Sequence, residues 1–350
     1  MGNSYSFDKK EKILTIHKVP IDENGNCSYP WDKLMGKVKK IVIEGTVTLI
    51  PKRAFANCWN LTAVSIPSYV TKIEEEAFAN CAELKTVFIP SSIKEISSSA
   101  FNNCCSLSSI NVDENNLNYV SQNGVLFSKD FSFLIRFPSS REEKSYIIPS
   151  SVSSICEYAF NGCSNLTSLS IPKNVTSFAK CAFSNCHNLT SISLPETITS
   201  IEEEAFTTCY KLIDLAIPGE CKVATNAFRN CFTLVIVNAL KAEFGSFAVG
   251  DKNLQSLIEN LLYYLNDCYD EIDLLSKLTT ALKQFYDNLK VKESSVQSFK
   301  RLISLLLPLR YKIRDSGLEV QLNSIYKEIN NDNIFENIDN NPSLLHYHKF

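Results

Sequence analysis

The sequence has no hydrophobic run long enough to cross a membrane. A membrane helix needs about 18 apolar residues in succession, and the longest candidate, Leu302 to Leu307, is far shorter. The first ten residues, Met1 to Lys10, also lack the apolar core of a signal peptide. We therefore expect a cytoplasmic protein that has neither a signal peptide nor a transmembrane helix.

Positive charge is not in excess either. The sequence has 35 Lys and Arg residues against 38 Asp and Glu residues, which gives a net charge of −3. A nucleic-acid-binding surface needs clustered Lys and Arg to neutralise phosphates. The charge balance therefore argues against a nucleic-acid partner.

Motifs typical of enzymes are absent. The sequence contains no glycine-rich phosphate loop, no H-E-x-x-H and no G-x-S-x-G. His187 follows Cys186, but this pair lacks a third group that would orient it for nucleophilic catalysis. We expect no catalytic residue, no metal site, no cofactor and no small-molecule substrate.

Thirteen cysteines are present, yet the sequence has no C-x-x-C pair. An odd number of cysteines at periodic spacing is unlike the disulfide framework of a small secreted protein. The pattern predicts reduced thiols that fill a repeated position of the core.

What the sequence does contain is an internal repeat, in which Ala-Phe is followed three residues later by Cys and three residues later again by Leu. The phenylalanines are separated by 23, 23, 59, 23, 23 and 22 residues, and are Phe55, Phe78, Phe101, Phe160, Phe183, Phe206 and Phe228. A period of about 23 residues lies in the range of leucine-rich repeats. One unit cannot enclose a core, so the repeat predicts stacked units with ladders of Phe, Cys and Leu.

One unit carries a specific resemblance. Residues Ile66 to Pro90 match I-P-x-x-V-T-x-I-x-x-x-A-F-x-x-C-x-x-L-x-x-V-x-I-P, the consensus of the BspA-like leucine-rich-repeat family, at every fixed position. The resemblance covers residues 1 to about 240 and implies a right-handed coil with a parallel β-sheet. Members of this family are implicated in adhesion at cell surfaces and in protein–protein contact, which implies a non-enzymatic binding role here.

The 59-residue separation interrupts the array. It equals one period plus 36 further residues, among which Asn123-Gly124 lies between two apolar runs and predicts a hairpin insert at 113–148. An insert of this kind also occurs in the family. The expected domains are an N-terminal β cap at 1–45, seven repeat units at 46–240, an α-helical region at 251–329 and an Asn-rich tail at 330–350.

The helical region is predicted from a change of period after residue 250. Four segments there carry apolar residues at the spacing of one helix face. They predict a small α-helical bundle or a cap folded onto the last repeat. The alternative is a separate effector or dimerisation module.

The exposed positions of the repeat strands are the candidate binding site. Residues that flank the central apolar residue of each strand should face solvent, and most of them are small and polar. We predict a docking face, and the alternative is that these residues are consensus strand residues which the fold tolerates. The predicted docking residues are Ala63, Ser65, Thr86, Phe88, Ser109, Asn111, Ser168, Ser170, Ser191, Ser193, Asp214 and Ala216.

Two kinds of modification motif bear on localisation. Gly2 lies in an M-G-x-x-x-[ST] pattern for myristoylation, although one acyl chain binds a membrane only weakly. Four Asn-x-Thr sequons, at Asn60, Asn165, Asn174 and Asn188, can carry sugar only on a secretory route. The sequence therefore predicts an intracellular scaffold with an unidentified protein partner. The alternative is an adhesin-like surface antigen of the same fold, associated with a membrane or the cell surface.

Overall fold

The computed structural model describes residues 4–19, 29–45, 47–212, 215–224 and 226–231. The repeat array, Met1–Cys209 with Ala216–Arg229, is one compact unit and is described by itself. Gly2, Asp214, the predicted helical region at 251–329 and the tail at 330–350 lie outside the described residues.

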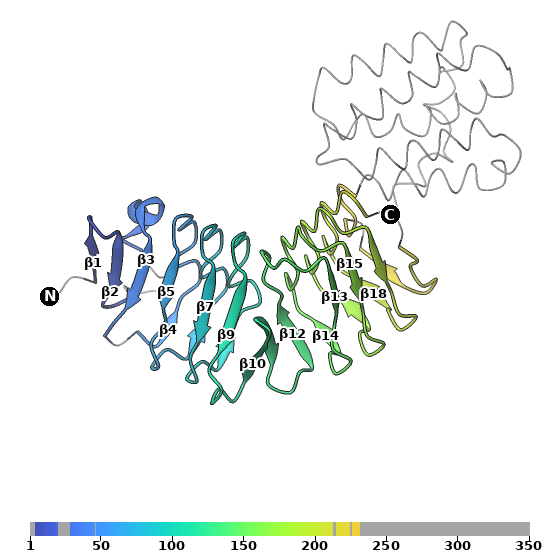
Figure 1. Ribbon diagram of the computed structural model, residues 1–350, viewed down its shortest axis with the longest axis horizontal. Coiled ribbons are helices and arrows are strands. Elements are labelled where there is room, and N and C mark those ends of the chain that lie inside the picture. Colours follow the sequence, from blue (N-terminus) through green and yellow to red (C-terminus); the bar gives the residue numbers. More distant parts are fainter. Residues whose placement is uncertain (1–3, 20–28, 46, 213–214, 225, 232–350) are drawn as a thin grey trace, which may run out of the picture. The chain divides into compact units, whose positions relative to one another are not determined.

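The repeats form a β-solenoid in which each unit contributes a strand to one long row (Figure 1). The first strand, β1 (Tyr5–Asp8), runs antiparallel to β2 (Ile13–Ile16), and all later strands of this row run parallel to their partners. The row is divided into three sheets, β1-β2-β3-β5, β7-β9 and β13-β15-β17. Its other members are β3 (Lys40–Ile43), β5 (Ala63–Ser65), β7 (Thr86–Ile89), β9 (Ser109–Val112), β13 (Ser145–Ile147), β15 (Ser168–Ser170) and β17 (Ser191–Ser193).

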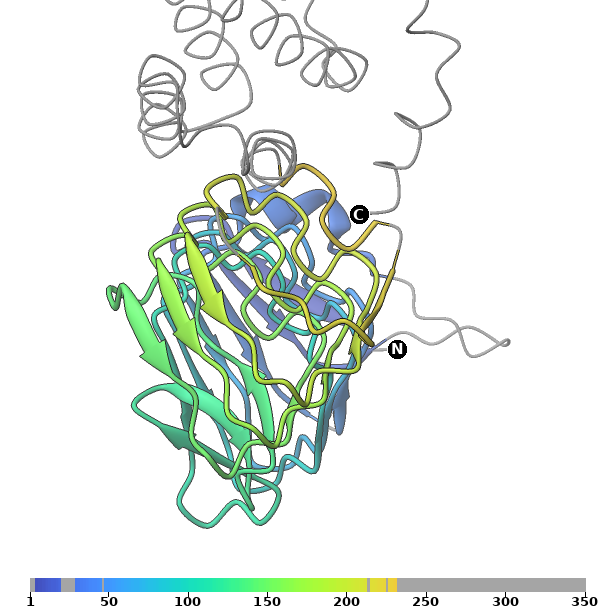
Figure 2. The same cartoon turned by 90° about the vertical axis from the view of Figure 1, so that its right-hand side faces the viewer.

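A second row contains the two-residue strands that precede the Ala-Phe pair of each unit, together with three four-residue strands between residues 119 and 136. Figure 2 views the coils end-on, so that successive units lie behind one another. The first sheet of this row contains β4 (Leu49–Ile50), β6 (Lys72–Ile73) and β8 (Glu95–Ile96). The second contains, in spatial order, β10 (Tyr119–Gln122), β11 (Val125–Ser128), β12 (Phe133–Arg136), β14 (Ser154–Ile155), β16 (Ser177–Phe178), β18 (Ser200–Ile201) and β19 (Lys222–Val223). The solenoid with parallel sheets predicted from the repeat is thereby confirmed.

The core consists of the predicted ladders. Phe78 stacks between Phe55 and Phe101, with ring centroids 5.4 and 5.6 Å apart. The cysteines form a second ladder beside the rings. The thiols of Cys81, Cys104, Cys163, Cys186 and Cys209 each donate to the phenylalanine carbonyl of the preceding unit, as in Cys81 Sγ to Phe55 O at 3.4 Å. Burial raises the pKa of the Cys58 thiol to about 12, so this thiol is held protonated and inert at neutral pH.

The N-terminal segment closes the open end of both ladders. This segment contains η1 (Asp32–Lys37), a 3₁₀-helix preceded by Trp31. The indole ring stacks on Phe55 with centroids 6.1 Å apart, and its Nε1 donates to the carbonyl of Ala54 at 2.9 Å. Met35 takes the position of the repeat cysteine, with its Sδ 3.0 Å from Cys58 Sγ. The cap thus presents a repeat-like surface without being a repeat.

The segment for which the sequence predicted a hairpin insert contains β10 to β12. β10 and β11 are antiparallel and are joined by Asn123-Gly124, both with positive φ. The turn lies against β9, since Ile110 N donates to Gly124 O at 2.9 Å. A Cβ atom on Gly124 would come within 2.6 Å of Ser109 Oγ, so this close approach requires glycine.

After the hairpins, Phe137 resumes the aromatic ladder. It lies 23 residues before Phe160 and stacks on that ring with centroids 5.2 Å apart. The unit that it begins lacks the usual Ala, Cys and Leu and carries Arg136, Ser140 and Glu143 at those positions. The backbone of this unit therefore follows the course of a repeat, but its side chains at the three core positions are not those of a repeat.

The β11–β12 turn supplies a pH-dependent contact. The Asp130 carboxylate accepts hydrogen bonds from Ser128 Oγ at 2.6 Å and Ser132 Oγ at 2.7 Å, and such bonds lower its pKa to about 2. Because the folded pKa lies below the unfolded value, this stabilisation is present above about pH 4 and is lost as the pH falls towards 2. We expect Asp130→Ala to lower the thermal unfolding midpoint at neutral pH, and we expect the difference from wild type to shrink at pH 3. Thermal unfolding at both pH values tests this, and a difference independent of pH would contradict it.

Candidate interaction surfaces

Strand register brings the predicted docking residues together on one face of the first strand row. Thr86 pairs with Ser109 and Phe88 with Asn111 in one sheet. In the third sheet the partners are Ser168 with Ser191 and Ser170 with Ser193. Ala63 and Ser65 occupy the same positions on β5. Ala216 is exposed but is not in a strand, and Asp214 lies outside the described residues.

The register adds residues that the sequence did not single out. Lys40 and Val42 of β3 lie beside Ala63 and Ser65. Ser145 and Ile147 of β13 lie beside Ser168 and Ser170.

Ile147 was missed because its segment was assigned to the insert. The spacing of Tyr146, Ile148 and Pro149 after Phe137 is nonetheless that of an ordinary repeat strand, and it could have identified β13. Ile147 is 78% exposed and Phe88 is 52% exposed, which makes them the large apolar side chains of this face.

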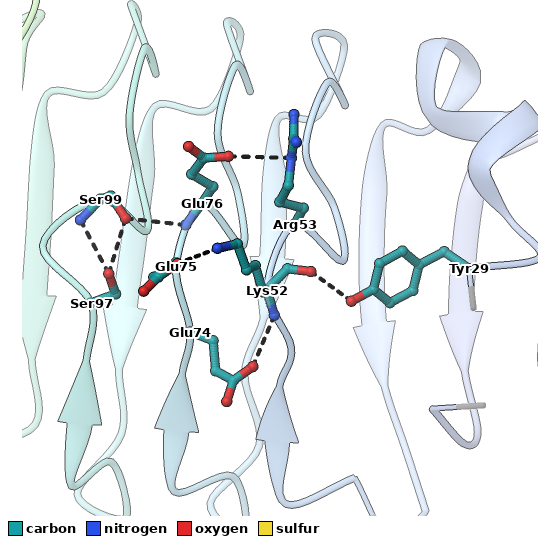
Figure 3. Close-up of polar contacts among 8 residues, drawn as sticks. All are labelled: Tyr29, Lys52, Arg53, Glu74, Glu75, Glu76, Ser97 and Ser99. Carbon is teal, nitrogen blue, oxygen red and sulfur yellow. Dashed lines mark hydrogen bonds and ion pairs between the residues drawn. The ribbon is translucent and has the colours of Figure 1, made fainter. Parts of the chain in front are cut away.

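A second surface is formed by charged residues on the turns of the first repeats (Figure 3). Lys52 Nζ lies 2.5 Å from Glu75 Oε2, and Arg53 Nε lies 3.2 Å from Glu76 Oε2 in the next unit. The hydrogen bond and the charge of Lys52 lower the pKa of Glu75. The same arrangement recurs between Lys180 and Glu203 at 3.3 Å. These exposed pairs join neighbouring units, and pairs of this kind contribute little to stability.

A groove of about 790 Å³ lies where the first strand row is interrupted. Its wall includes Arg141, whose Nε lies 3.1 Å from Glu143 Oε2 and whose Nη1 donates to the carbonyl of Asn123. The Arg141 guanidinium also lies over the Phe137 ring, 5.3 Å from its centroid. The groove is lined by Lys85, Ser106, Ser108, Ser140, Arg141, Glu142 and Glu143.

The sequons have a structural role that accounts for their presence. In Asn188-Leu189-Thr190, the Asn188 amide donates to Ser164 O at 2.7 Å and the Thr190 hydroxyl donates to Thr167 O at 3.0 Å. Leu189 between them is buried in the core. The amide nitrogens of Asn60, Asn165 and Asn174 donate in the same way to the preceding unit.

Removing one of these amides should therefore weaken the contact between two units. We expect Asn188→Ala to lower the free energy of unfolding by about 0.5–1.5 kcal/mol, since one partly buried hydrogen bond is lost. Asn188→Asp is measured beside it, because this substitution removes the same donor while the size of the side chain is kept. Denaturant titration measures both, and wild-type stability in both variants would show that the amide does not join the units.

The one candidate for nucleophilic chemistry is placed unfavourably. Cys186 is fully buried, and its Sγ donates to Phe160 O at 3.1 Å. Burial lowers the pKa of the adjacent His187.

Within the described ranges, no group of three or more His, Cys, Asp and Glu residues could hold a metal ion. No helix within them has the length and hydropathy needed to cross a membrane.

The repeat geometry agrees with the comparison of the sequence with known families. The signature described as BspA type leucine rich repeat region matches residues 33–132 and 135–248, in six copies. The chain belongs to the BspA-type leucine-rich-repeat family. No curated protein is significantly similar to this BspA-type chain in sequence.

Several solved structures are similar to this chain. A leucine-rich cell surface protein from Faecalibacterium prausnitzii is 33% identical, over 56% of this chain and 52% of that one, with a TM-score of 0.53. The pneumococcal vaccine antigen PcpA is 24% identical, over 63% of this chain and 65% of its own, with a TM-score of 0.51, and shows the same fold. This BspA-type chain therefore spans about half the length of the Faecalibacterium protein.

Proposed function

We propose that this chain is a non-enzymatic scaffold that binds a protein partner through the exposed face of the first strand row. The observation that carries the proposal is the pair of large apolar side chains, Phe88 and Ile147, which are 52% and 78% exposed on a face of small polar residues. Large side chains that a partner buries at the centre of an interface carry much of its binding energy, and we assign this anchor role to Phe88 and Ile147. The family of the chain also favours protein binding over catalysis.

The geometry of the face supports the same conclusion. β7 and β9 hold Phe88 beside Asn111 in register, and β15 and β17 hold Ser170 beside Ser193. Main-chain pairing fixes these side chains in position, so a partner would meet a rigid surface that does not have to be ordered on binding. Small hydroxyls around an aromatic residue provide hydrogen-bond donors and acceptors without the desolvation cost of charges.

Proximity labelling in the native cell tests this proposal. The labelled proteins of the wild type are compared with those of Phe88→Ser and of Ser170→Arg, which places a long charged side chain on the face. Leu117→Ser is the matched control, because Leu117 is 83% exposed but lies outside the strand row. We expect both face variants, and not the control, to lose the same labelled partner. Unchanged labelling in the face variants would overturn the proposal.

A second candidate is an adhesin-like role at the cell surface. It is favoured by the 33% identical neighbour, which is described as a cell surface protein. Labelling of intact native cells with a membrane-impermeant amine reagent tests it, because the chain has exposed lysines such as Lys33 and Lys37. Labelled protein on intact cells would support the surface role, and labelling only after lysis would support an intracellular scaffold. The intact mass of the same sample would show whether Gly2 is acylated.

A further inference from the structure

The first strand row is broken between β9 and β13, although the units that carry these strands are neighbours. Ser140 N donates to Leu107 O at 2.8 Å, and Ser139 Oγ donates to Cys104 O at 2.7 Å, so the two units are joined at their turns. Beyond this point they separate, and β9 and β13 belong to different sheets.

The break is visible in the backbone hydrogen bonds that begin each strand. Ser108 N donates to Lys85 O at 2.9 Å on one side of the break, and Thr167 N donates to Lys144 O at 2.7 Å on the other. The corresponding bond from Lys144 N to Ser108 O is not formed in the structure described for these residues. The groove lined by Ser108 and Glu143 lies at this position.

The two strand edges that face the break are not equivalent. The edge of β9 is covered by the insert, because Ile110 N donates to Gly124 O and Val112 N donates to Ser121 Oγ. β13 is the terminal strand of its sheet, and its inner edge bonds to β15, with Ile148 N donating to Ser170 O at 3.2 Å. Because backbone groups alternate in direction along a strand, the Ile147 N–H points away from β15. An open strand edge of this kind is a template for another strand.

The chemistry of the groove restricts what can bind there. The charges of Lys85 and Arg141 are balanced by those of Glu142 and Glu143, so the lining is neutral overall. The Ser106 and Ser140 hydroxyls are each able to donate and to accept a hydrogen bond, whereas Ser108 Oγ donates to Lys85 O at 3.1 Å and can still accept. A neutral lining that offers both donors and acceptors fits a polypeptide backbone better than it fits an anion or an apolar molecule.

We propose that an extended peptide segment of a protein partner adds as a strand to the outer edge of β13 and continues into this groove. The main-chain groups of the peptide pair with the edge, and Ile147 contacts one of its side chains. This inference rests on the proposed function, and it names the part of the partner that binds and the place where it docks.

The test uses a displayed library of random peptides of about ten residues, selected on the full chain. Recovered peptides are then measured by fluorescence anisotropy against the wild type, Ile147→Pro and Ile147→Thr. Proline removes the outward N–H but leaves the bonds to β15, and it is tolerated on an edge strand. Threonine keeps the N–H and is the matched control. We expect binding to Ile147→Pro to be about fivefold to tenfold weaker than to Ile147→Thr, the effect of one lost hydrogen bond.

A second variant tests the groove without touching a strand. Lys85 is exposed and has no ion pair among the residues that the structure describes, so Lys85→Glu should leave the fold intact while giving the lining a net negative charge. We expect Lys85→Glu to lower the affinity of the same peptides severalfold. Thermal unfolding verifies that each variant is folded.

The proposal is overturned if no peptide is enriched or if the peptides bind equally to all variants. It is also overturned if inorganic phosphate displaces them, because the groove would then be an anion site. Loss of the labelled partner in Phe88→Ser with no peptide bound at β13 would overturn this inference alone. Retention of that partner in Phe88→Ser would overturn the proposed function instead.

Discussion

Replacing Phe183 with alanine is expected to lower the free energy of unfolding by about 3–5 kcal/mol. Phe183 is fully buried and stacks on Phe160 and Phe206, with ring centroids 5.2 and 5.0 Å apart. The Phe178 ring contacts it edge-on at 5.0 Å. The substitution therefore leaves a cavity shared by three units, and these rings cannot close it without moving their own backbones.

In a solenoid each unit contacts only its neighbours, so the effect should be local as well as large. Denaturant titration measures the loss of stability, and hydrogen exchange should show faster opening of β16 and β18 than of β7 and β9. Phe133→Ala is the matched control. Because Phe133 is 47% exposed, this substitution should lower the free energy of unfolding far less. Equal losses in the two variants would mean that the ladder does not couple the units.

Replacing Arg136 with alanine is expected to cost about 2–4 kcal/mol. Arg136 is 1% exposed at a position where other repeats have alanine. Its guanidinium donates to Tyr158 O at 2.5 Å and to Asn161 O at 3.1 Å. The substitution leaves both carbonyls of the next turn without this donor and opens a cavity in the core. Tyr158 has a φ of 58°, and the equivalent residues of other units, such as Glu76 and Cys181, have the same left-handed backbone, so this turn does not itself require Arg136.

An opposing contribution makes this prediction informative. Burial lowers the pKa of the Arg136 guanidinium, and its Nε has no hydrogen-bond partner among the described residues. A buried charge without a carboxylate is costly, so removing it returns part of the loss. Arg136→Lys keeps the charge but replaces the two nitrogens of the planar fork, which donate to separate carbonyls, with a single nitrogen, and its stability should lie between that of wild type and that of alanine. If denaturant titration gave the alanine variant the same stability as wild type, the free-energy cost of burying the charge would equal the stabilisation from the two hydrogen bonds and the packing of Arg136.

The sequence predicted those parts of the fold that follow from its period. Phe78, Cys81 and Leu84 recur in fixed register, and stacked units must place equivalent residues in ladders. The same logic located the exposed face, since the residues on either side of a buried strand position point the other way. Phe88 was found in this way, although its role in binding remains a prediction.

The sequence did not reveal the break between β9 and β13, because the break results from a unit that departs from the consensus. Ser140 and Glu143 stand where other units have the core Cys and Leu, so the residue pattern that identifies a repeat is missing from the unit beside the break. The groove forms because β9 and β13 do not pair. The spacing of residues within a unit does not indicate whether two strands on either side of an insert will pair. Arg136 was missed for the same reason, since no other unit has a charged residue at its position.

The cap of Trp31 and Met35 has a consequence for how this array can change in length. These residues offer the first repeat an aromatic ring and a sulfur atom at the places where a preceding repeat would offer the ring of Phe and the sulfur of Cys, so the cap is matched to the period and not to one particular unit. A stretch of about 23 residues could therefore be gained or lost inside the array without altering its beginning. Variation in the number of coils is then open to evolution at little structural cost, and the length of the exposed strand face would vary with it.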